Sequence, residues 1–261
     1  MSTSRRWVRF DHQGSIGLGT LDGASIAVHD GDMFGAARPT GRSLALADVK
    51  LLMPVRPGKV LALWNNYLAL AAKLGLADPA EPLYFMKAPS SYLNPDEAIV
   101  APPGQGKIVY EGELAIVIGR RAKAVREADA LGHVFGYSCC NDVTAAEVLN
   151  RDSTFAQWVR AKSYDTFCPL GPCIATGLDP GTLVVKTWLD GQLRQDYPVA
   201  DIRFSVPRLV SLISHDMTLE PGDVILCGTS VGVGSMKPGQ TVEIEIEGIG
   251  KLTNRFESPP H

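Results

Sequence analysis

The sequence predicts an α+β protein in which strands dominate. Its 261 residues include 26 glycines and 18 prolines, and turn signals recur between short aliphatic runs, which is typical of many short strands. Few segments repeat apolar residues at helical spacing. Hydrophobic residues make up 45% and charged residues 20% of the chain, an ordinary balance for a globular protein of one large domain or of a small and a larger one.

Residues 1–57 are expected to form a small β-rich N-terminal domain. Short strand-like pieces alternate there with turn signals at Gly14, Asp22-Gly23, Asp30-Gly31 and Pro39-Thr40-Gly41. Such sequences favour β-hairpins. The proline-rich stretch 54–58 is the predicted boundary, and residues 58–261 are expected to form the second domain.

The first half of the second domain predicts two strands separated by a helix and a long loop. Residues 60–64 indicate a strand, and residues 68–74 indicate a short helix that ends at Gly75. Residues 76–107 are rich in proline and loop formers. Residues 108–119 read as one aliphatic, β-branched strand, and residues 125–133 read as a helix.

The second half predicts more strands and two further helices. Residues 135–140 read as a strand, and Thr144 and Glu147 have capping-box spacing, so a helix is expected just after Asp142. Another helix is expected to begin at Ser205, with apolar residues at positions 206, 209, 210 and 213. Asp190-Gly191 predicts a hairpin, and the strands at 224–230 and 242–250 follow Pro-Gly turns.

Charge and composition argue against several classes of protein. The net charge is −3 and the chain has no long basic run, so it lacks the electrostatic footprint of a nucleic-acid binder. No apolar stretch is long enough to cross a membrane, and the first residues do not resemble a signal peptide. Five cysteines, an odd number, fit packing roles in a reducing, cytoplasmic compartment better than a disulfide framework.

Two glutamates interrupt the aliphatic run YEGELAIVIG at residues 110–119. Because side chains alternate along a strand, Glu111 and Glu113 would share one face. Placing two carboxylates side by side in a poorly solvated environment costs on the order of several kcal/mol, unless a proton, a base or a metal cation compensates them. The simpler alternative is a strand end that reaches water.

Asp142 lies 29 residues after Glu113, at the end of the next expected strand. Taken alone, it could equally be the N-cap of a helix. Together with Glu111 and Glu113 it would make an all-oxygen site, and such ligands select Mg²⁺, Mn²⁺ or Ca²⁺ rather than zinc.

Five sequence motifs resemble those of a known protein family. In order they are EGELAIVIG, GYSCCNDVTAAE, QWVRAKSYDTFCPLGP, LEPGDVILCGTSVGVG and VEIEIEGIGKLTNR. Over roughly residues 59–256 the chain resembles the fumarylacetoacetate hydrolase family, and residues 1–57 look like the small extra domain of many bacterial members. The resemblance implies a mixed β-roll, a homodimer and a small-molecule 2-oxo acid as substrate.

The resemblance also implies roles for individual residues. Glu111, Glu113 and Asp142 match the ligands of Mg²⁺ or Mn²⁺, and Lys162 matches a catalytic lysine that holds an enolate oxygen or a substrate carboxylate. Three positions match residues near the substrate, namely Gln157, Thr229 and Lys87. Ser230 stands where the family usually has proline.

One departure from the family concerns water activation. Hydrolytic members carry N-Y-x-x-H followed by a glutamate, whereas the matching segment here begins at Asn66 and has Leu70 and Lys73 at those two places. Leucine cannot act as a general base. Decarboxylation or isomerisation of a 2-oxo acid needs only an electron sink and a proton, so these reactions are favoured.

Two alternatives stay open. Hydrolysis of an acylpyruvate could use another base, such as Lys73 or a metal-bound hydroxide. The protein could also be a catalytically silent member that binds metal and a 2-oxo acid without turnover.

Overall fold

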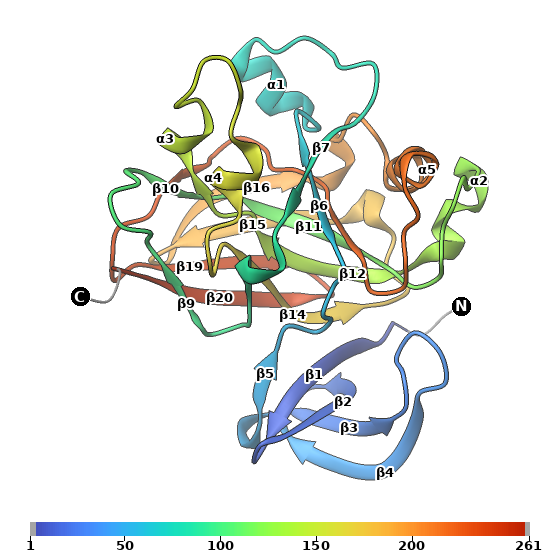
Figure 1. The fold of residues 1–261 in the computed structure, drawn as a ribbon. Helices are drawn as coiled ribbons and strands as arrows, with labels where there is room; N and C mark the ends of the chain where they lie inside the picture. The colour runs from blue at the N-terminus through green and yellow to red at the C-terminus, as the bar shows by residue number, and fades with distance from the viewer. Residues whose placement is uncertain (1–3, 259–261) are drawn as a thin grey trace.

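The N-terminal strands form an antiparallel meander that lies beside the rest of the chain (Figure 1). The computed structural model describes residues 4–258. The strands are β1 (Arg6–His12), β2 (Ser15–Asp22), β3 (Ser25–Asp30), β4 (Arg38–Ala45) and β5 (Lys50–Leu52). Hairpins form at Gly14 and Gly23 as predicted. The turn predicted at residues 39–41 is wrong, because these residues lie inside β4, where the β3–β4 register shifts.

The large sheet continues from the N-terminal strands into the second domain. Trp7 of β1 pairs with Ile174 of β14, so the sheet runs β4-β3-β2-β1-β14-β12-β11-β17-β6-β7. Its remaining strands are β6 (Val60–Trp64), β7 (Leu83–Lys87), β8 (Tyr92–Leu93), β11 (Gly112–Ile118), β12 (Val134–Asn141), β14 (Cys168–Ala175) and β17 (Val224–Leu226). Every residue of β11 is buried, which explains the aliphatic run in the sequence.

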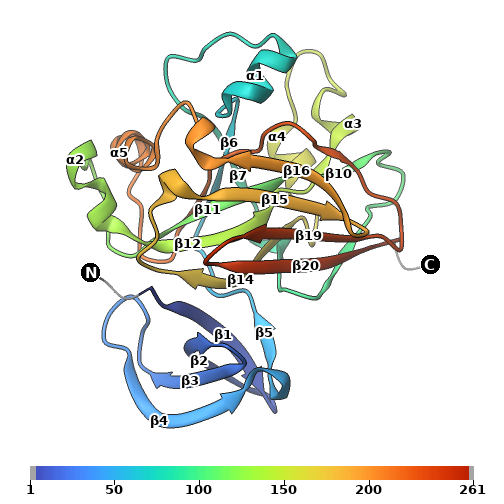
Figure 2. The ribbon, with the colours of Figure 1, turned by 180° about the vertical axis from the view of Figure 1, so that it is seen from behind.

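Two smaller sheets complete the strand-dominated architecture (Figure 2). The first has the order β16-β15-β19-β20-β9 and the second the order β13-β10-β18. Their strands are β9 (Ala98–Val100), β10 (Ile108–Tyr110), β13 (Thr144–Ala145), β15 (Val184–Leu189), β16 (Gln192–Pro198), β18 (Gly234–Ser235), β19 (Thr241–Ile246) and β20 (Gly250–Glu257). The predicted hairpin at Asp190-Gly191 joins β15 to β16.

The helices are short and lie at the edges of the sheets (Figure 1). They are α1 (Leu68–Leu74), α2 (Glu127–Ala130), α3 (Ala146–Leu149), α4 (Trp158–Lys162) and α5 (Val206–Asp216). Gly75 ends α1 in the left-handed conformation, and the Ser205 hydroxyl caps α5 by accepting from Arg208 N, both as predicted. In the described part of the chain, no helix is long and apolar enough to cross a membrane.

The structure differs from the sequence-based expectation around the two glutamates. The strand predicted over 108–119 is broken at Glu111, and its halves, β10 and β11, belong to different sheets. Two side chains replace ladder bonds at the break, because Glu111 N donates to Asn141 Oδ1 (2.9 Å) and Gly112 N donates to Gln195 Oε1 (3.0 Å). Glu111 therefore lies where the two sheets separate.

The capping box predicted at Thr144 and Glu147 is also wrong. Thr144 belongs to β13, and α3 begins after it with no side-chain cap. The Thr144 hydroxyl instead donates to Glu111 Oε1 at 2.8 Å. A carboxylate is a stronger acceptor than a neutral group, so the long-range contact replaces the local one.

All five cysteines are buried and free, as the composition predicted. Their positions are Cys139, Cys140, Cys168, Cys173 and Cys227.

Candidate active site

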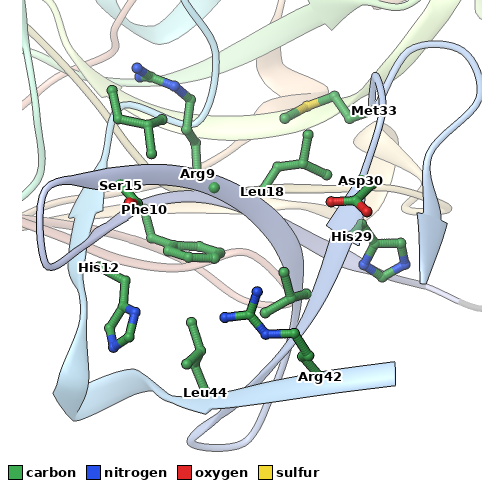
Figure 3. A pocket seen from close by; sticks show the side chains of 14 residues that line it. Arg9, Phe10, His12, Ser15, Leu18, His29, Asp30, Met33, Arg42 and Leu44 are labelled. Atoms are coloured by element: carbon green, nitrogen blue, oxygen red, sulfur yellow. The ribbon is translucent and has the colours of Figure 1, made fainter. Parts of the chain in front are cut away.

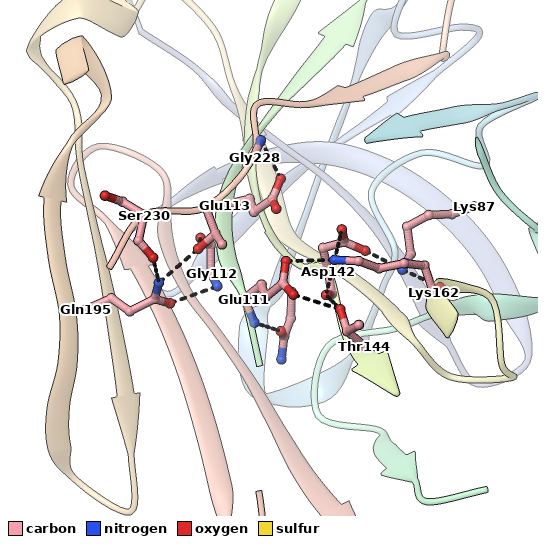
Figure 4. Close-up of polar contacts among 12 residues, drawn as sticks. Lys87, Glu111, Gly112, Glu113, Asp142, Thr144, Lys162, Gln195, Gly228 and Ser230 are labelled. Carbon is pink, nitrogen blue, oxygen red and sulfur yellow. Dashed lines mark hydrogen bonds and ion pairs between the residues drawn. The ribbon is translucent and has the colours of Figure 1, made fainter. Parts of the chain in front are cut away.

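Three carboxylates from two parts of the chain meet at the break between β10 and β11. Glu111 lies at the break, Glu113 lies on β11, and Asp142 follows β12 directly. One oxygen of each lies within 4.8 Å of the others (Figure 4). Glu113 and Asp142 are fully buried, and the side chain of Glu111 is 14% exposed. Asp142 is not a helix N-cap, and neither glutamate lies at a strand end open to water.

The antiparallel pairing of β11 with β12 produces this meeting. Gly112 lies opposite Asn141 in the ladder, and Asp142 N donates to Glu111 O at 2.9 Å. The register therefore places Asp142 beside Glu111 although the two residues are far apart in sequence.

Two buried lysines reach the same carboxylates. Lys162, at the end of α4, donates to Glu111 Oε2 and to Asp142 Oδ2, each at 2.7 Å. Lys87, at the end of β7, donates to Asp142 Oδ1 and to the backbone oxygen of Lys162, each at 2.5 Å. The side chains of both lysines are no more than 4% exposed, so these are desolvated ion pairs.

The lysines and carboxylates of this cluster shift one another's pKa values. Burial by itself would lower the pKa of Lys162, but Asp142, Glu111 and Glu113 outweigh it and raise that pKa. Burial would likewise raise the pKa of Asp142, but the two lysines outweigh it and hold the pKa below its usual value. Asp142 and Lys162 are therefore ionised near neutral pH.

Glu113 has a different environment. Its Oε2 accepts from Gly228 N at 2.8 Å, whereas its buried Oε1 has no hydrogen-bond partner among the described residues. Burial, and then the neighbouring Asp142, raise the pKa of Glu113 well above its usual value. Three clustered carboxylates, one of which keeps an unpartnered buried oxygen, form a donor set that fits a divalent cation.

Thr229 belongs to a polar network beside the triad, and it is the only member of that network predicted from the sequence as a substrate-binding residue. The Thr229 hydroxyl donates to Gly112 O (2.9 Å) and accepts from Gln195 Nε2 (2.8 Å). Tyr197 also donates to Gly112 O. Gln195 was missed, because it lies on a hairpin strand and no local motif distinguishes it; only the tertiary contact across 83 residues shows its place.

The described contacts do not join Gln157 or the segment after Asn66 to the triad. Gln157 precedes α4, whose last residue is Lys162, and its side chain donates to Phe155 O at 3.3 Å. Leu70 packs against the core, and Lys73 is exposed in the last turn of α1. Within the described range 4–258, the side chain of Lys73 forms no hydrogen bond or ion pair.

A hollow of about 380 Å³ lies in the N-terminal meander (Figure 3). Its polar side chains include Arg9, His12, Asp30 and Arg42. None of the residues predicted for the site lines it, so we place the candidate chemistry at the triad.

Comparison with known proteins identifies the family. The fumarylacetoacetate (FAA) hydrolase C-terminal family matches residues 59–257, and the Rv2993c-like N-terminal family matches residues 5–54. A solved 2-hydroxyhepta-2,4-diene-1,7-dioate isomerase from Mycobacterium marinum is 37% identical, with a TM-score of 0.90, and covers 98% of this chain and 100% of its own.

Two further relatives differ in the reaction named for them. The 4-hydroxyphenylacetate degradation bifunctional isomerase/decarboxylase of Escherichia coli is 39% identical over 209 residues, which are 79% of this chain and 48% of the relative. The maleylpyruvate hydrolase of Sphingobium sp. SYK-6, solved with manganese(II) and pyruvate, is 30% identical with a TM-score of 0.79, covering 98% of this chain and 100% of its own.

The matched range contains the acidic triad, both buried lysines and Thr229, and the five motifs occur in it in the expected order. The strand-dominated fold with a small β-rich N-terminal domain is likewise shared. The chain therefore belongs to the fumarylacetoacetate hydrolase family.

Proposed function

We propose that this protein is a divalent-metal-dependent lyase or isomerase that acts on a 2-oxo acid, by stabilising an enolate. The observation that carries the proposal is the buried triad with one free carboxylate oxygen and two lysines in contact with it. Membership in a family that includes a bifunctional isomerase/decarboxylase and a maleylpyruvate hydrolase solved with manganese(II) supports it.

Glu111, Glu113 and Asp142 would hold the metal. Oxygen ligands favour Mg²⁺ or Mn²⁺, and the manganese reported for the Sphingobium relative supports the second. When bound, the metal would act as a Lewis acid toward the carboxylate and 2-oxo group of the substrate.

Lys162 would supply the other charge. Its raised pKa keeps the ammonium protonated, so it can stabilise negative charge on a substrate oxygen and cannot serve as a base while it stays paired. We propose that Lys87 acts by positioning Asp142, since its donors already bind Asp142 and the Lys162 carbonyl. Thr229 and Gln157 would contact the substrate.

The replaced dyad favours this reaction over hydrolysis. Leu70 has no proton to exchange, and Lys73 is exposed and forms none of the described contacts with the triad. Hydrolysis needs an activated water as well as an electron sink, whereas decarboxylation and isomerisation need the sink and a returned proton.

Product analysis by proton NMR tests the proposal. The protein with Mg²⁺ is mixed separately with oxaloacetate and with acetylpyruvate, each against an EDTA control. We expect metal-dependent pyruvate from oxaloacetate. Acetate and pyruvate from acetylpyruvate would instead show hydrolysis, and no turnover of a panel that also includes a dienoic 2-oxo acid would favour a silent binding member.

Two further properties are proposals as well. We propose a homodimer, tested by light scattering for a mass of twice 28.0 kDa. We also propose a cytoplasmic location, which the five free cysteines support.

A further inference from the structure

An aromatic cavity lies between the ends of β6 and β7 and the start of α4. Its volume is about 370 Å³, which is large enough for a substituent of a small-molecule ligand. The lining residues are Trp64, Pro82, Leu83, Tyr84, Phe85 and Trp158. None of these six residues has a role in the proposed chemistry.

Ring contacts connect this cavity to Lys162. The Lys162 ammonium lies 5.4 Å from the centre of the Phe85 ring, and the same ammonium binds two carboxylates of the triad. The Phe85 ring stacks on the Trp158 ring with their centres 5.3 Å apart, and the centres of the Trp158 and Trp64 rings are 5.1 Å apart. The Phe85 ring therefore both lines the cavity and contacts the Lys162 ammonium.

The sheet register also places the cavity and the triad at the same end of one face. Ala115, Leu226, Ala62 and Phe85 lie opposite one another across β11, β17, β6 and β7. The strand β11 runs antiparallel to β17, and β6 runs parallel to β17, so β11 and β6 run in opposite directions. Glu113, two residues before Ala115, and Trp64, two residues after Ala62, therefore lie toward the same end of the sheet. Residues two apart share a face.

The lining chemistry favours an uncharged occupant. None of the six lining residues, all within the described range, carries a charge. The Tyr84 hydroxyl already donates to Asp216 Oδ2 at 2.9 Å. A carboxylate here would lose its hydration without gaining a cation, whereas an aryl or alkyl group would gain from burial.

We propose that this cavity binds the uncharged aryl or alkyl end of the 2-oxo acid substrate, so that the preferred substrate carries an apolar substituent rather than a second distal carboxylate. This inference rests on the proposed function, because it requires the oxo-acid end to lie at the triad. Leu83, 42% exposed at the rim, is a specificity-determining residue in this arrangement.

Binding of three inert analogues tests the inference without relying on turnover. Oxamate, N-phenyloxamate and N-(carboxymethyl)oxamate share one oxalyl head and differ only in the distal group. Calorimetric titrations of the Mg²⁺-loaded protein should show N-phenyloxamate binding ~10- to 100-fold more tightly than oxamate, as burial of a phenyl group predicts. N-(carboxymethyl)oxamate should bind no more tightly than oxamate.

A charge placed at the rim should reverse this preference. Leu83→Arg should lower the affinity for N-phenyloxamate and raise that for N-(carboxymethyl)oxamate, so that the ratio of the two falls by ~10-fold or more. Leu131→Arg is the matched control, since Leu131 is 50% exposed and follows α2 directly in the chain. The helix α2 lies on the other side of the molecule from α4 (Figure 1). Its ratio should equal that of the wild type.

The outcomes separate the two proposals. Equal, Mg²⁺-dependent affinities for all three analogues would overturn the inference and leave the proposed function standing. No Mg²⁺-dependent binding of any analogue would overturn the proposed function and the inference with it. If Leu83→Arg changed the oligomeric mass but not the affinity ratio, the cavity would be an interface between copies of the chain, and the inference would be wrong.

Discussion

Replacing Lys87 by methionine would leave the buried Asp142 with one ion-pair partner instead of two. The Lys87 side chain is 0% exposed and that of Asp142 is 1% exposed, so water cannot replace the lost ammonium. Methionine has a similar length and no charge, and it removes the two hydrogen bonds to Asp142 Oδ1 and to the Lys162 carbonyl.

The expected loss follows from the burial. Breaking a fully buried ion pair costs ~3–5 kcal/mol. Asp142 keeps its 2.7 Å contact with Lys162, so we expect the lower end of that range, a loss of about 3 kcal/mol in the free energy of unfolding. For a chain of this size that corresponds to a fall of roughly 6–12 °C in the melting temperature.

Thermal unfolding in EDTA measures this loss, and Lys50→Met is the matched control. Lys50 binds Glu97 at a similar distance, 2.6 Å, but the two side chains are 58% and 32% exposed, and such surface pairs contribute about 0–1 kcal/mol. Added Mn²⁺ should reduce the difference between Lys87→Met and the wild type, because the cation would compensate the same carboxylate. If the two variants melted within a degree or so of each other in EDTA, the ion pair at Asp142 would not contribute as inferred.

Three further predictions concern the triad and its surroundings. Asp142→Ala should abolish metal-dependent turnover and lower Mn²⁺ affinity more than ~100-fold, since even outer-shell changes cost 10- to 100-fold; surviving activity would mean that the assigned ligands are wrong. Because burial raises the pKa of Glu113, its proton must leave before the carboxylate can bind metal. Apparent Mn²⁺ affinity should therefore rise with pH above the usual titration range of a glutamate, with proton release. Calorimetry in buffers of different ionisation enthalpy measures both, and a flat profile without proton release would contradict this prediction. Gln195→Leu would leave Gly112 N without its acceptor and remove the bond donated to the Thr229 hydroxyl, and it should cost about 1–3 kcal/mol in urea unfolding. Gln192→Leu, on the exposed part of the same strand, should cost almost nothing.

Local signals in the sequence predicted the elements that depend on a few adjacent residues. The hairpin at Asp190-Gly191, the end of α1 at Gly75 and the Ser205 cap of α5 all formed as expected. Each depends on the backbone preferences of one or two residues and on hydrogen bonds that span a single turn. The aliphatic run around Glu113 likewise predicted a buried strand.

Local signals failed where a distant side chain offered a better partner. Thr144 had the spacing of a capping residue, but its hydroxyl binds Glu111 across 33 positions of sequence. The strand expected over 108–119 breaks because Asn141 and Gln195 satisfy the backbone at Glu111 and Gly112. Neither partner could be identified from the residues next to the break.

The candidate site divides in the same way. The candidate carboxylates can be identified from the residues alone, because two glutamates in an aliphatic strand and an aspartate after the next strand are costly unless something compensates them. The folded chain shows in addition that two lysines share that compensation, that Glu113 keeps an unpartnered oxygen and that Phe85 connects an aromatic cavity to Lys162. These contacts could not be predicted, because strand register and the packing of α4 against β7 bring together side chains that lie far apart in the sequence.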